Sequence, residues 1–363
     1  MIKIRPQTMW LNVNRQCNFR CRWCYAKGSR YQPDDDMPLD LAINLVELAY
    51  SIGIRNTLII GGEPILWNPL LSFNKECRHL GMKTTLVTNA MRFGIDSYWM
   101  HYIQSPNDKI GVSVKAADAQ QLYETTGVRN FELVRRGISR VVEYFKCGIS
   151  LTYNSFYRGR LLDITRFALD CNARSMKIDF CSVVFLNNRA SAKYMVKPQK
   201  IVEDVVASYP EIDRLLNSNL VFEMGLPLCI WPREFINNLV EKRRIISVCQ
   251  LLKRKGLIFD TGGSMIMCNA LFGHPIGKYG DDFVDSRSLL TFLNSEKVGN
   301  LYDRMTCYPS VECVQCDWYN YCGGGCPLKW TVYKPDCFVK SMYEKKEVMK
   351  KWMKSSISYV LPT

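Results

Sequence analysis

The sequence predicts an α/β fold: a partial (β/α)6 barrel of the TIM type, followed by a small cysteine-rich domain and a C-terminal helix. Short apolar runs alternate with amphipathic stretches over the first half of the chain, which implies a parallel sheet with helices packed outside it. Beyond residue 208 this alternation stops, and Cys, Gly and turn residues become frequent. The 363 residues, 47% of them hydrophobic, are enough for one large core and a smaller module.

Each predicted element comes from an apolar pattern bounded by loops. The six strands are expected at Met9–Val13, Asn56–Ile60, Lys83–Val87, Lys109–Val114, Ile149–Tyr153 and Lys177–Val184. The helices between them are expected at Leu39–Ser51, Leu70–Leu80, Phe131–Phe145 and Leu161–Cys171. In a barrel of this kind the functional residues gather at the C-terminal ends of the strands.

Four segments follow from the changes in composition along the chain. We place the barrel at 1–208, a bridging region with Pro210, Pro227 and Pro232 at 209–248, a cysteine-rich domain at 249–338, and a C-terminal helix and tail at 339–363. Bound metal could hold the cysteine-rich part together where its apolar core is thin. The lysine-rich last segment predicts a surface helix packed on the barrel, or alternatively a helix that binds a membrane surface.

Composition excludes several classes of protein. The sequence has 16 cysteines and begins without the apolar run of an export signal, so we expect a cytoplasmic protein whose cysteines bind metal rather than form disulfides. Its three histidines are not paired at ligand spacing, which argues against imidazole chemistry. No uncharged apolar stretch reaches the roughly 18 residues of a membrane span.

Two motifs follow the first two predicted strands. Cys17, Cys21 and Cys24 form a C-x3-C-x2-C run, and three thiolates can hold only three corners of a [4Fe–4S] cubane. One iron would then stay open, as in a catalytic metal site; a zinc knuckle or a chance cluster is the alternative. The run Gly61-Gly62-Glu63-Pro64 allows close backbone approach and offers a carboxylate to an ammonium group, although alone it could be an ordinary turn.

The C-x3-C-x2-C run, with Trp23 before its third cysteine, resembles the signature of the radical S-adenosylmethionine (radical SAM) superfamily. The resemblance implies that the open iron binds the amino and carboxylate groups of SAM, and that reductive cleavage gives a 5′-deoxyadenosyl radical. It also implies that the GGEP run binds the methionine amino group. Weaker cofactor contacts, each of which could instead be a turn or cap residue, are expected at Thr88, Asn89, Ser113, Lys115 and Asn154.

A second set of cysteines lies near the C-terminus. These are Cys249, Cys268, Cys313, Cys316, Cys322, Cys326 and Cys337, with Gly263 five residues before the second. Their spacing resembles the SPASM domain, a radical SAM extension that binds two auxiliary [4Fe–4S] clusters, which would make three clusters in all. Two all-thiolate zinc sites are the alternative.

The resemblance also implies how these cysteines divide. An outer cluster would take Cys313, Cys316, Cys322 and Cys337, and an inner cluster Cys249, Cys268 and Cys326. For the missing inner ligand Cys229 is the first candidate and Cys307 the second, with an open iron as the third possibility; Cys229 could also be a buried apolar thiol. Cys181, at the mouth of the sixth strand, could return a hydrogen atom to a substrate radical or be a packing residue.

SPASM members most often modify peptides or proteins, so we expect a maturase that cross-links, epimerises or excises part of a ribosomally made peptide. The alternatives are a small-molecule radical SAM dehydrogenase and sulfatase-like protein oxidation, which Asn269 disfavours because that subfamily has Asp there.

A formal charge of +14 suits an acidic leader peptide or a flavodoxin or ferredoxin reductant, although ordinary surface lysines explain it equally. A separate leader-recognition protein could deliver the substrate. Nucleic acid is disfavoured because no arginine–aromatic patch stands out.

Overall fold

A mixed α/β fold with a largely parallel sheet forms the protein. The computed structural model describes residues 4–28, 35–186, 189–246, 249–305, 313 and 315–332. In these residues eleven strands form one sheet in the order β10-β9-β6-β5-β4-β3-β2-β1-β11-β12-β13, and β7 and β8 form a separate hairpin. The strands are β1 (Thr8–Asn12), β2 (Asn56–Ile60), β3 (Lys83–Thr88), β4 (Lys109–Ser113), β5 (Ile149–Tyr153), β6 (Met176–Phe180), β7 (Val184–Leu186), β8 (Arg189–Ser191), β9 (Leu220–Glu223), β10 (Ile245–Ile246), β11 (Gly256–Phe259), β12 (Ser264–Ile266) and β13 (Gly277–Lys278).

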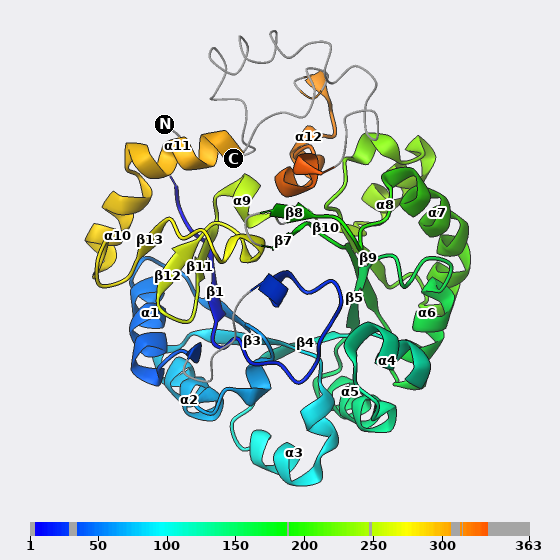
Figure 1. Cartoon of the computed structure of the whole chain (residues 1–363), viewed down its shortest axis with the longest axis horizontal. Coiled ribbons are helices and arrows are strands. Elements are labelled where there is room, and N and C mark those ends of the chain that lie inside the picture. The colour runs from blue at the N-terminus through cyan, green and yellow to red at the C-terminus, as the bar shows by residue number, and fades with distance from the viewer. Residues whose placement is uncertain are drawn as a thin grey trace.

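The helices lie around the outside of the strands, and the loop after β1 crosses the centre of the ring (Figure 1). Strands β1 to β6, β9, β10 and β11 pair in parallel, while β12 and β13 are antiparallel additions. The α-helices are α1 (Leu39–Ser51), α2 (Leu70–Leu80), α3 (Asp96–Tyr102), α4 (Ala119–Thr126), α5 (Phe131–Phe145), α6 (Leu161–Asp170), α7 (Pro198–Leu215), α8 (Arg233–Glu241), α9 (Gln250–Lys253), α10 (Ser286–Leu293), α11 (Glu296–Met305) and α12 (Tyr319–Cys322).

Alternation along the strands separates a helix-facing core from the barrel interior. In β5 the side chains of Ile149, Leu151 and Tyr153 are buried, whereas Ser150 and Thr152 are only partly covered. Successive side chains of a strand point to opposite faces, so the partly covered residues line the interior. Polar side chains of this strand therefore face the barrel interior, and its apolar side chains pack against the surrounding helices.

The sixth predicted strand is shorter than expected. Strand β6 ends at Phe180, and its pairing with β5 finishes where the Cys181 N–H donates to the Tyr153 carbonyl at 2.8 Å. Val184 then begins β7, whose partner is β8 rather than the main sheet. The apolar run therefore combines two strands, because hydropathy does not mark where the pairing partner changes.

The sheet continues across the predicted domain boundaries. Helix α7 runs through Pro210, and β9 and β10 extend one edge of the barrel sheet. At the other edge β11 pairs in parallel with β1, so part of the cysteine-rich segment joins the same sheet. The predicted C-terminal helix at 339–363 lies outside the described residues.

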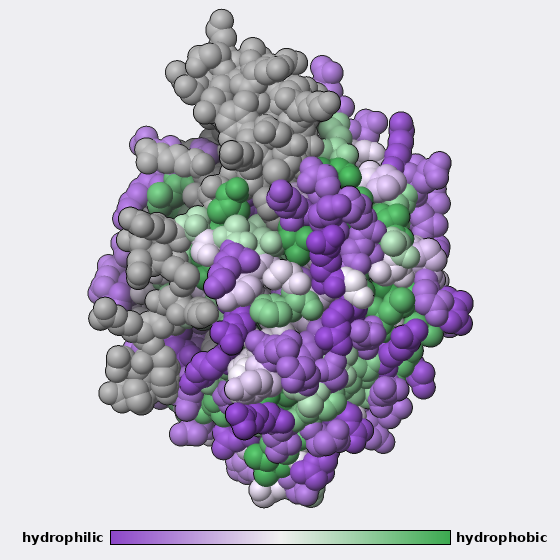
Figure 2. Space-filling model, turned by 45° about the vertical axis from the view of Figure 1, so that its right-hand side comes forward, coloured by the Kyte–Doolittle hydropathy of each residue, from purple (hydrophilic) through white to green (hydrophobic). Residues whose placement is uncertain are grey.

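The described surface mixes polar and apolar residues. Figure 2 shows one face on which hydrophilic and hydrophobic side chains are interspersed. Within the described ranges, no helix combines the length and apolar character needed to cross a bilayer.

Replacing Gly137 with Ala should destabilise the protein by about 1–3 kcal/mol, because a Cβ there would overlap the Ala90 carbonyl where α5 packs on the 3₁₀ turn Met91–Gly94. Gly262 is the matched control, since a Cβ there meets nothing within 4 Å and should change stability by less than about 0.5 kcal/mol. Urea unfolding of both variants measures the difference, and equal midpoints would contradict the packing argument.

Candidate functional site

The loop after β1, which carries Cys17, Cys21 and Cys24, crosses the centre of the ring of strands (Figure 1). Its backbone is held from the far side of the barrel. The N–H groups of Arg20 and Arg22 donate to carbonyl oxygens at the C-terminal end of α4, at 2.8 and 3.0 Å. The loop is thus anchored at β1 and at α4, on opposite sides of the space it crosses.

The three thiols of this loop suit a cluster that carries positive charge. Burial raises the pKa of Cys21 to about 11, with Lys115 opposing and Cys24 adding to the shift. Burial raises the pKa of Cys17 further, and Glu63 and the other two cysteines add to it. Ligation requires thiolates, and the irons of a cluster supply the charge that stabilises them. This donor set fits three corners of a cubane.

A single metal ion needs a tighter arrangement than a cubane does. No group of three or more His, Cys, Asp or Glu side chains in the described part of the chain is arranged to hold one ion. In a cubane each cysteine binds a different iron, so the sulfurs need not converge on one point.

Gly61 and Gly62 bring the second motif against the start of the cysteine loop. A Cβ on Gly61 would lie 2.5 Å from the Asn14 carbonyl oxygen, and one on Gly62 would overlap the Gln16 carbonyl. The Gly62 and Glu63 N–H groups donate to the same two carbonyls, at 2.8 and 2.6 Å. We expected these glycines to let a ligand approach the backbone closely. In the structure they let the backbone of Asn14–Gln16 approach closely, and this contact positions Glu63 beside the cysteine loop.

Glu63 is a buried carboxylate, 2% exposed, with three hydrogen-bond donors. It accepts from the Thr88 hydroxyl at 2.6 Å, the Asn89 N–H at 2.7 Å and the Ile65 N–H at 3.4 Å. Burial raises its pKa to about 7, and the three hydrogen bonds oppose that shift. Pro64 begins the 3₁₀ turn Pro64–Leu66, whose N-cap is Glu63. Such a carboxylate can receive an ammonium group, as the GGEP resemblance implies.

Lys115 lies between the two motifs and the barrel interior. It follows β4, which ends at the half-buried Ser113, and its charge lowers the pKa of both Cys21 and Glu63. Its Nζ stands 6.0 Å from the centre of the Trp23 ring. Lys115 is therefore placed to meet an anionic group near the cysteine loop.

Two other predicted cofactor residues make structural contacts in this structure. Trp23 is 6% exposed and packs edge-on against Tyr157 at 5.5 Å. Asn154 is fully buried, donates to the Thr152 carbonyl at 3.0 Å and accepts from the Phe156 N–H at 2.9 Å. These contacts match the turn-residue alternative for Asn154. The Asn89 amide, by contrast, donates to Asn18 of the cysteine loop at 2.8 Å.

Three C-terminal cysteines come together as predicted for an inner group. Cys249 precedes α9, Cys268 follows β12, and Cys326 precedes the 3₁₀ turn Pro327–Thr331. Burial raises the pKa of Cys249 and of Cys268 to about 12, and the charge of Cys326 adds to both shifts.

Cys229 lies with a different set of thiols from the one we expected. Burial raises the pKa of Cys322 to about 11, and the charges of Cys229 and Cys316 add to the shift. The N–H of Leu228, the residue before Cys229, donates to the Cys322 sulfur at 3.3 Å. Cys229 therefore lies near Cys322, one of the cysteines expected in the outer group, and its role as an inner ligand stays a prediction. Cys313 is described and its carbonyl accepts from the Cys316 N–H at 3.4 Å; Cys307 and Cys337 lie outside the described residues.

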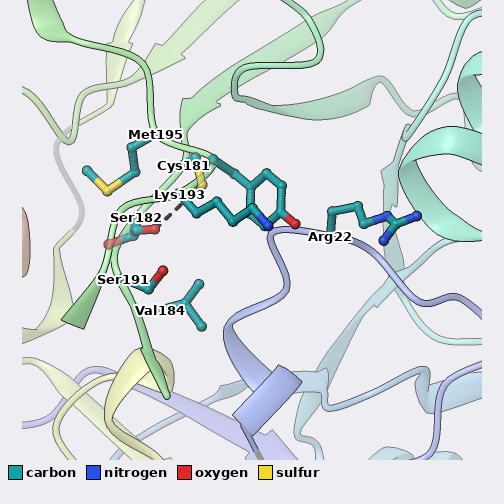
Figure 3. A pocket seen from close by; sticks show the side chains of 8 residues that line it. Arg22, Cys181, Ser182, Val184, Ser191, Lys193 and Met195 are labelled. Carbon is teal, nitrogen blue, oxygen red and sulfur yellow. Dashed lines mark hydrogen bonds between the residues drawn. The ribbon is translucent and has the colours of Figure 1, made fainter. Parts of the chain in front are cut away.

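Cys181 lines a cavity of about 150 Å³ at the mouth of β6. Figure 3 shows Arg22, from the cysteine loop, across this cavity from Ser182 and Ser191. Burial raises the pKa of Cys181 to about 12, and Lys329 opposes the shift. The neighbouring Ser182 hydroxyl lies 3.8 Å from the Cys326 sulfur. The lining of the cavity thus includes Arg22 of the cysteine loop and Ser182, a neighbour of Cys326 in the inner cysteine group.

Sequence reasoning missed the charged residues inside the barrel on β6 and β9. Lys177 donates to Glu223 at 2.6 Å, and burial followed by Glu223 raises the pKa of Asp179. The signal was present, because Lys177 and Asp179 alternate with apolar residues in β6. Alternation predicts that they share the interior face, but not that β9 brings Glu223 beside them.

The radical SAM superfamily model matches residues 11–157, the span from the cysteine loop to the end of the fifth strand–loop unit. Residues 11–157 form a radical SAM domain. The GTP 3′,8-cyclase of Haemophilus influenzae is 32% identical over 140 residues, which are 37% of this chain and 40% of that protein. The chain spans about half the length, or less, of the curated relatives it matches.

Two solved structures share the fold beyond the radical SAM domain. Streptococcus suis SuiB bound to precursor peptide SuiA has a TM-score of 0.66 at 18% identity, covering 93% of this chain and 76% of that one. The anSMEcpe structure with bound AdoMet and Kp18Cys peptide has a TM-score of 0.67 at 15% identity, covering 98% of each chain. The radical SAM family implies one [4Fe–4S] cluster and SAM, and the residues described above fit both.

Thr88→Val should weaken SAM binding at pH 7 by about tenfold, because Glu63 loses a hydrogen bond that lowers its pKa. SAM affinity in the reconstituted protein should fall as the pH drops through about 7, and in the variant this fall should occur at higher pH. Equilibrium dialysis from pH 6 to 9 measures both effects. The control is Thr165→Val, whose hydroxyl donates within α6 at 2.8 Å; an unchanged midpoint in Thr88→Val would contradict the role of Glu63.

Proposed function

We propose that this protein is a radical SAM/SPASM enzyme that modifies a ribosomally made peptide. The observation that carries the proposal is a cavity whose lining includes a residue of the cysteine loop and a neighbour of the inner cysteine group. The cavity is lined by Arg22 of the cysteine loop and by Ser182, which contacts Cys326 of the inner group. A substrate held there would lie between a radical-generating site and a second redox site.

At the site formed by the cysteine loop, different residues would bind the cluster and the two ends of the methionine part of SAM. The cluster, when bound, would supply the electron that cleaves SAM to a 5′-deoxyadenosyl radical. Cys17, Cys21 and Cys24 would hold it, Glu63 would orient the methionine ammonium, and Lys115 would face the carboxylate. The tethers of the cysteine loop to β1 and α4 hold these groups in a fixed relation, which reduces the reorganisation needed for reaction.

At the second site we propose two auxiliary [4Fe–4S] clusters. The proximity of Cys249, Cys268 and Cys326 supports an inner cluster, and the proximity of Cys316 and Cys322 supports an outer one. The shared fold with SuiB and anSMEcpe, which covers nearly the whole chain, supports a SPASM assignment.

A peptide is the substrate class that the similar structures favour, since SuiB is bound to a precursor peptide and anSMEcpe to a Kp18Cys peptide. The charge of +14 supports an acidic partner, either a leader sequence or a flavodoxin or ferredoxin that supplies electrons. Sulfatase-like oxidation remains disfavoured. Asn269 follows Cys268, and its side-chain Oδ1 accepts from the Asn12 amide at 3.0 Å. A carboxamide does not take up a proton, so Asn269 cannot act as the base that an Asp would supply.

A small-molecule substrate is the second candidate, because the curated relatives are GTP 3′,8-cyclases. The matched stretch of the Haemophilus influenzae enzyme is 140 residues, 37% of this chain. The family model likewise ends at residue 157, within the part that would bind SAM. We therefore rank this candidate below the peptide.

The decisive experiment is anaerobic turnover with precursor peptides encoded beside the gene. The wild-type protein should release 5′-deoxyadenosine and change the peptide mass, whereas the Cys17→Ala/Cys21→Ala/Cys24→Ala variant should do neither. This variant should still retain roughly two-thirds of the wild-type iron, because two of three clusters remain. Persistent SAM cleavage in it would refute the assignment, and 5′-deoxyadenosine formed with a nucleotide but no peptide would favour the second candidate.

Cys181 is our proposed hydrogen donor if the product is an epimer. Its S–H hydrogen atom would pass to the substrate radical, and an electron from a proposed auxiliary cluster with a proton from solvent would restore the thiol. The thiol proton exchanges with solvent, so turnover in D₂O should place one deuterium in the peptide. Cys181→Ala should lose this label while still forming 5′-deoxyadenosine. Cys171→Ala is the control, since Cys171 is a buried thiol at the end of α6. An unlabelled wild-type product would leave Cys181 as a packing residue.

A further inference from the structure

Lys329 is a lysine buried in the middle of the protein, 2% exposed. It lies in the 3₁₀ turn Pro327–Thr331, and its N–H donates to the Cys326 carbonyl at 3.0 Å. Its Nζ donates to the carbonyl oxygen of Phe180, the last residue of β6, at 2.9 Å. The side chain therefore connects the cysteine-rich segment to the mouth of the barrel.

This ammonium group has little of the compensation that a buried charge needs. Among the described residues, no carboxylate oxygen lies within 4.0 Å of its Nζ. Burial lowers its pKa; the negative charge that most opposes this is that of Cys326, followed by Cys181, Asp179 and Glu223. A buried ammonium without an opposite charge is strongly disfavoured, so an anion is expected in the immediate surroundings of Lys329.

Gly225 shows that Lys329 and Cys326 occupy the same small space. A Cβ built on Gly225 would lie 3.0 Å from the Lys329 Nζ and 3.9 Å from the Cys326 Cβ. The Gly225 carbonyl also accepts from the Cys326 N–H at 3.1 Å. The missing side chain of this glycine leaves room for the ammonium group next to the cysteine.

We propose that Lys329 is the counter-ion of the iron–sulfur cluster held by Cys249, Cys268 and Cys326, and that its charge sets the reduction potential of that cluster. This inference rests on the proposed auxiliary cluster. Once ligated, the three cysteines are thiolates, and the site becomes more negative on reduction by one electron. A fixed positive charge nearby stabilises the reduced form more than the oxidised form, which raises the reduction potential.

The experiment measures that potential in the background Cys17→Ala/Cys21→Ala/Cys24→Ala, which keeps only the C-terminal clusters. Lys329→Met removes the charge with a side chain of similar length, and Lys329→Gln removes the charge but keeps a donor for the Phe180 carbonyl. Both should shift the midpoint of one cluster signal in an EPR redox titration to a more negative value. Lys278→Met, a change at a lysine with a side chain 52% exposed in β13, should leave both midpoints unchanged.

The possible outcomes distinguish failure of this inference from failure of the proposed auxiliary clusters. If the background protein binds no iron, the proposed auxiliary clusters and this inference both fail. If iron is bound but neither Lys329 variant shifts a midpoint, only the inference fails. A shift in Lys329→Met without one in Lys329→Gln would assign the effect to the hydrogen bond with Phe180 and overturn the role of charge. Circular dichroism and iron content identify the variants that fold.

Discussion

The contact between the backbones of Gly61–Glu63 and Asn14–Gln16 determines the geometry of the candidate site. It joins the loop after β2 to the loop after β1, two segments that meet only because their strands are neighbours. The contact requires glycine at 61 and 62, since a Cβ at either would collide with a carbonyl of the cysteine loop. Through it, the buried carboxylate of Glu63 is held beside the thiols of the radical SAM domain.

Buried charge is the second organising feature. Glu63 is stabilised by hydrogen bonds from Thr88 and Asn89, and Lys115 stands near both Glu63 and Cys21. The Lys329 ammonium donates to the Phe180 carbonyl, but among the described residues no carboxylate oxygen lies within 4.0 Å of it. These groups are costly in a protein without cofactors, because each is removed from water before its counter-charge is present. For Glu63 and Lys115, the cluster and SAM that the radical SAM family implies explain the arrangement, and for Lys329 the auxiliary cluster that we propose would do so.

The two ends of the sheet explain how the cysteine-rich segment is positioned. Strand β11 extends the barrel sheet beside β1, and Asn12 of β1 donates to the Phe259 carbonyl of β11 at 3.1 Å as well as to Asn269. Cys249 lies before β11 and Cys268 after β12, so the pairing of β11 with the barrel sheet positions both cysteines. At the opposite edge, Gly225 follows β9 and receives Cys326. The inner cysteine group is thus assembled from both edges of one sheet.

The sequence by itself determined the strand–helix alternation and the two cysteine motifs, because periodicity and ligand spacing are local properties. It also indicated Glu63, since a carboxylate after paired glycines at a strand end is a local pattern. Only the tertiary structure decided that Gly61 and Gly62 contact backbone, that Cys229 lies beside Cys322, and that Lys329 is buried against Phe180 and Gly225. These facts depend on residues dozens to hundreds of positions apart, which become neighbours only through strand pairing and burial.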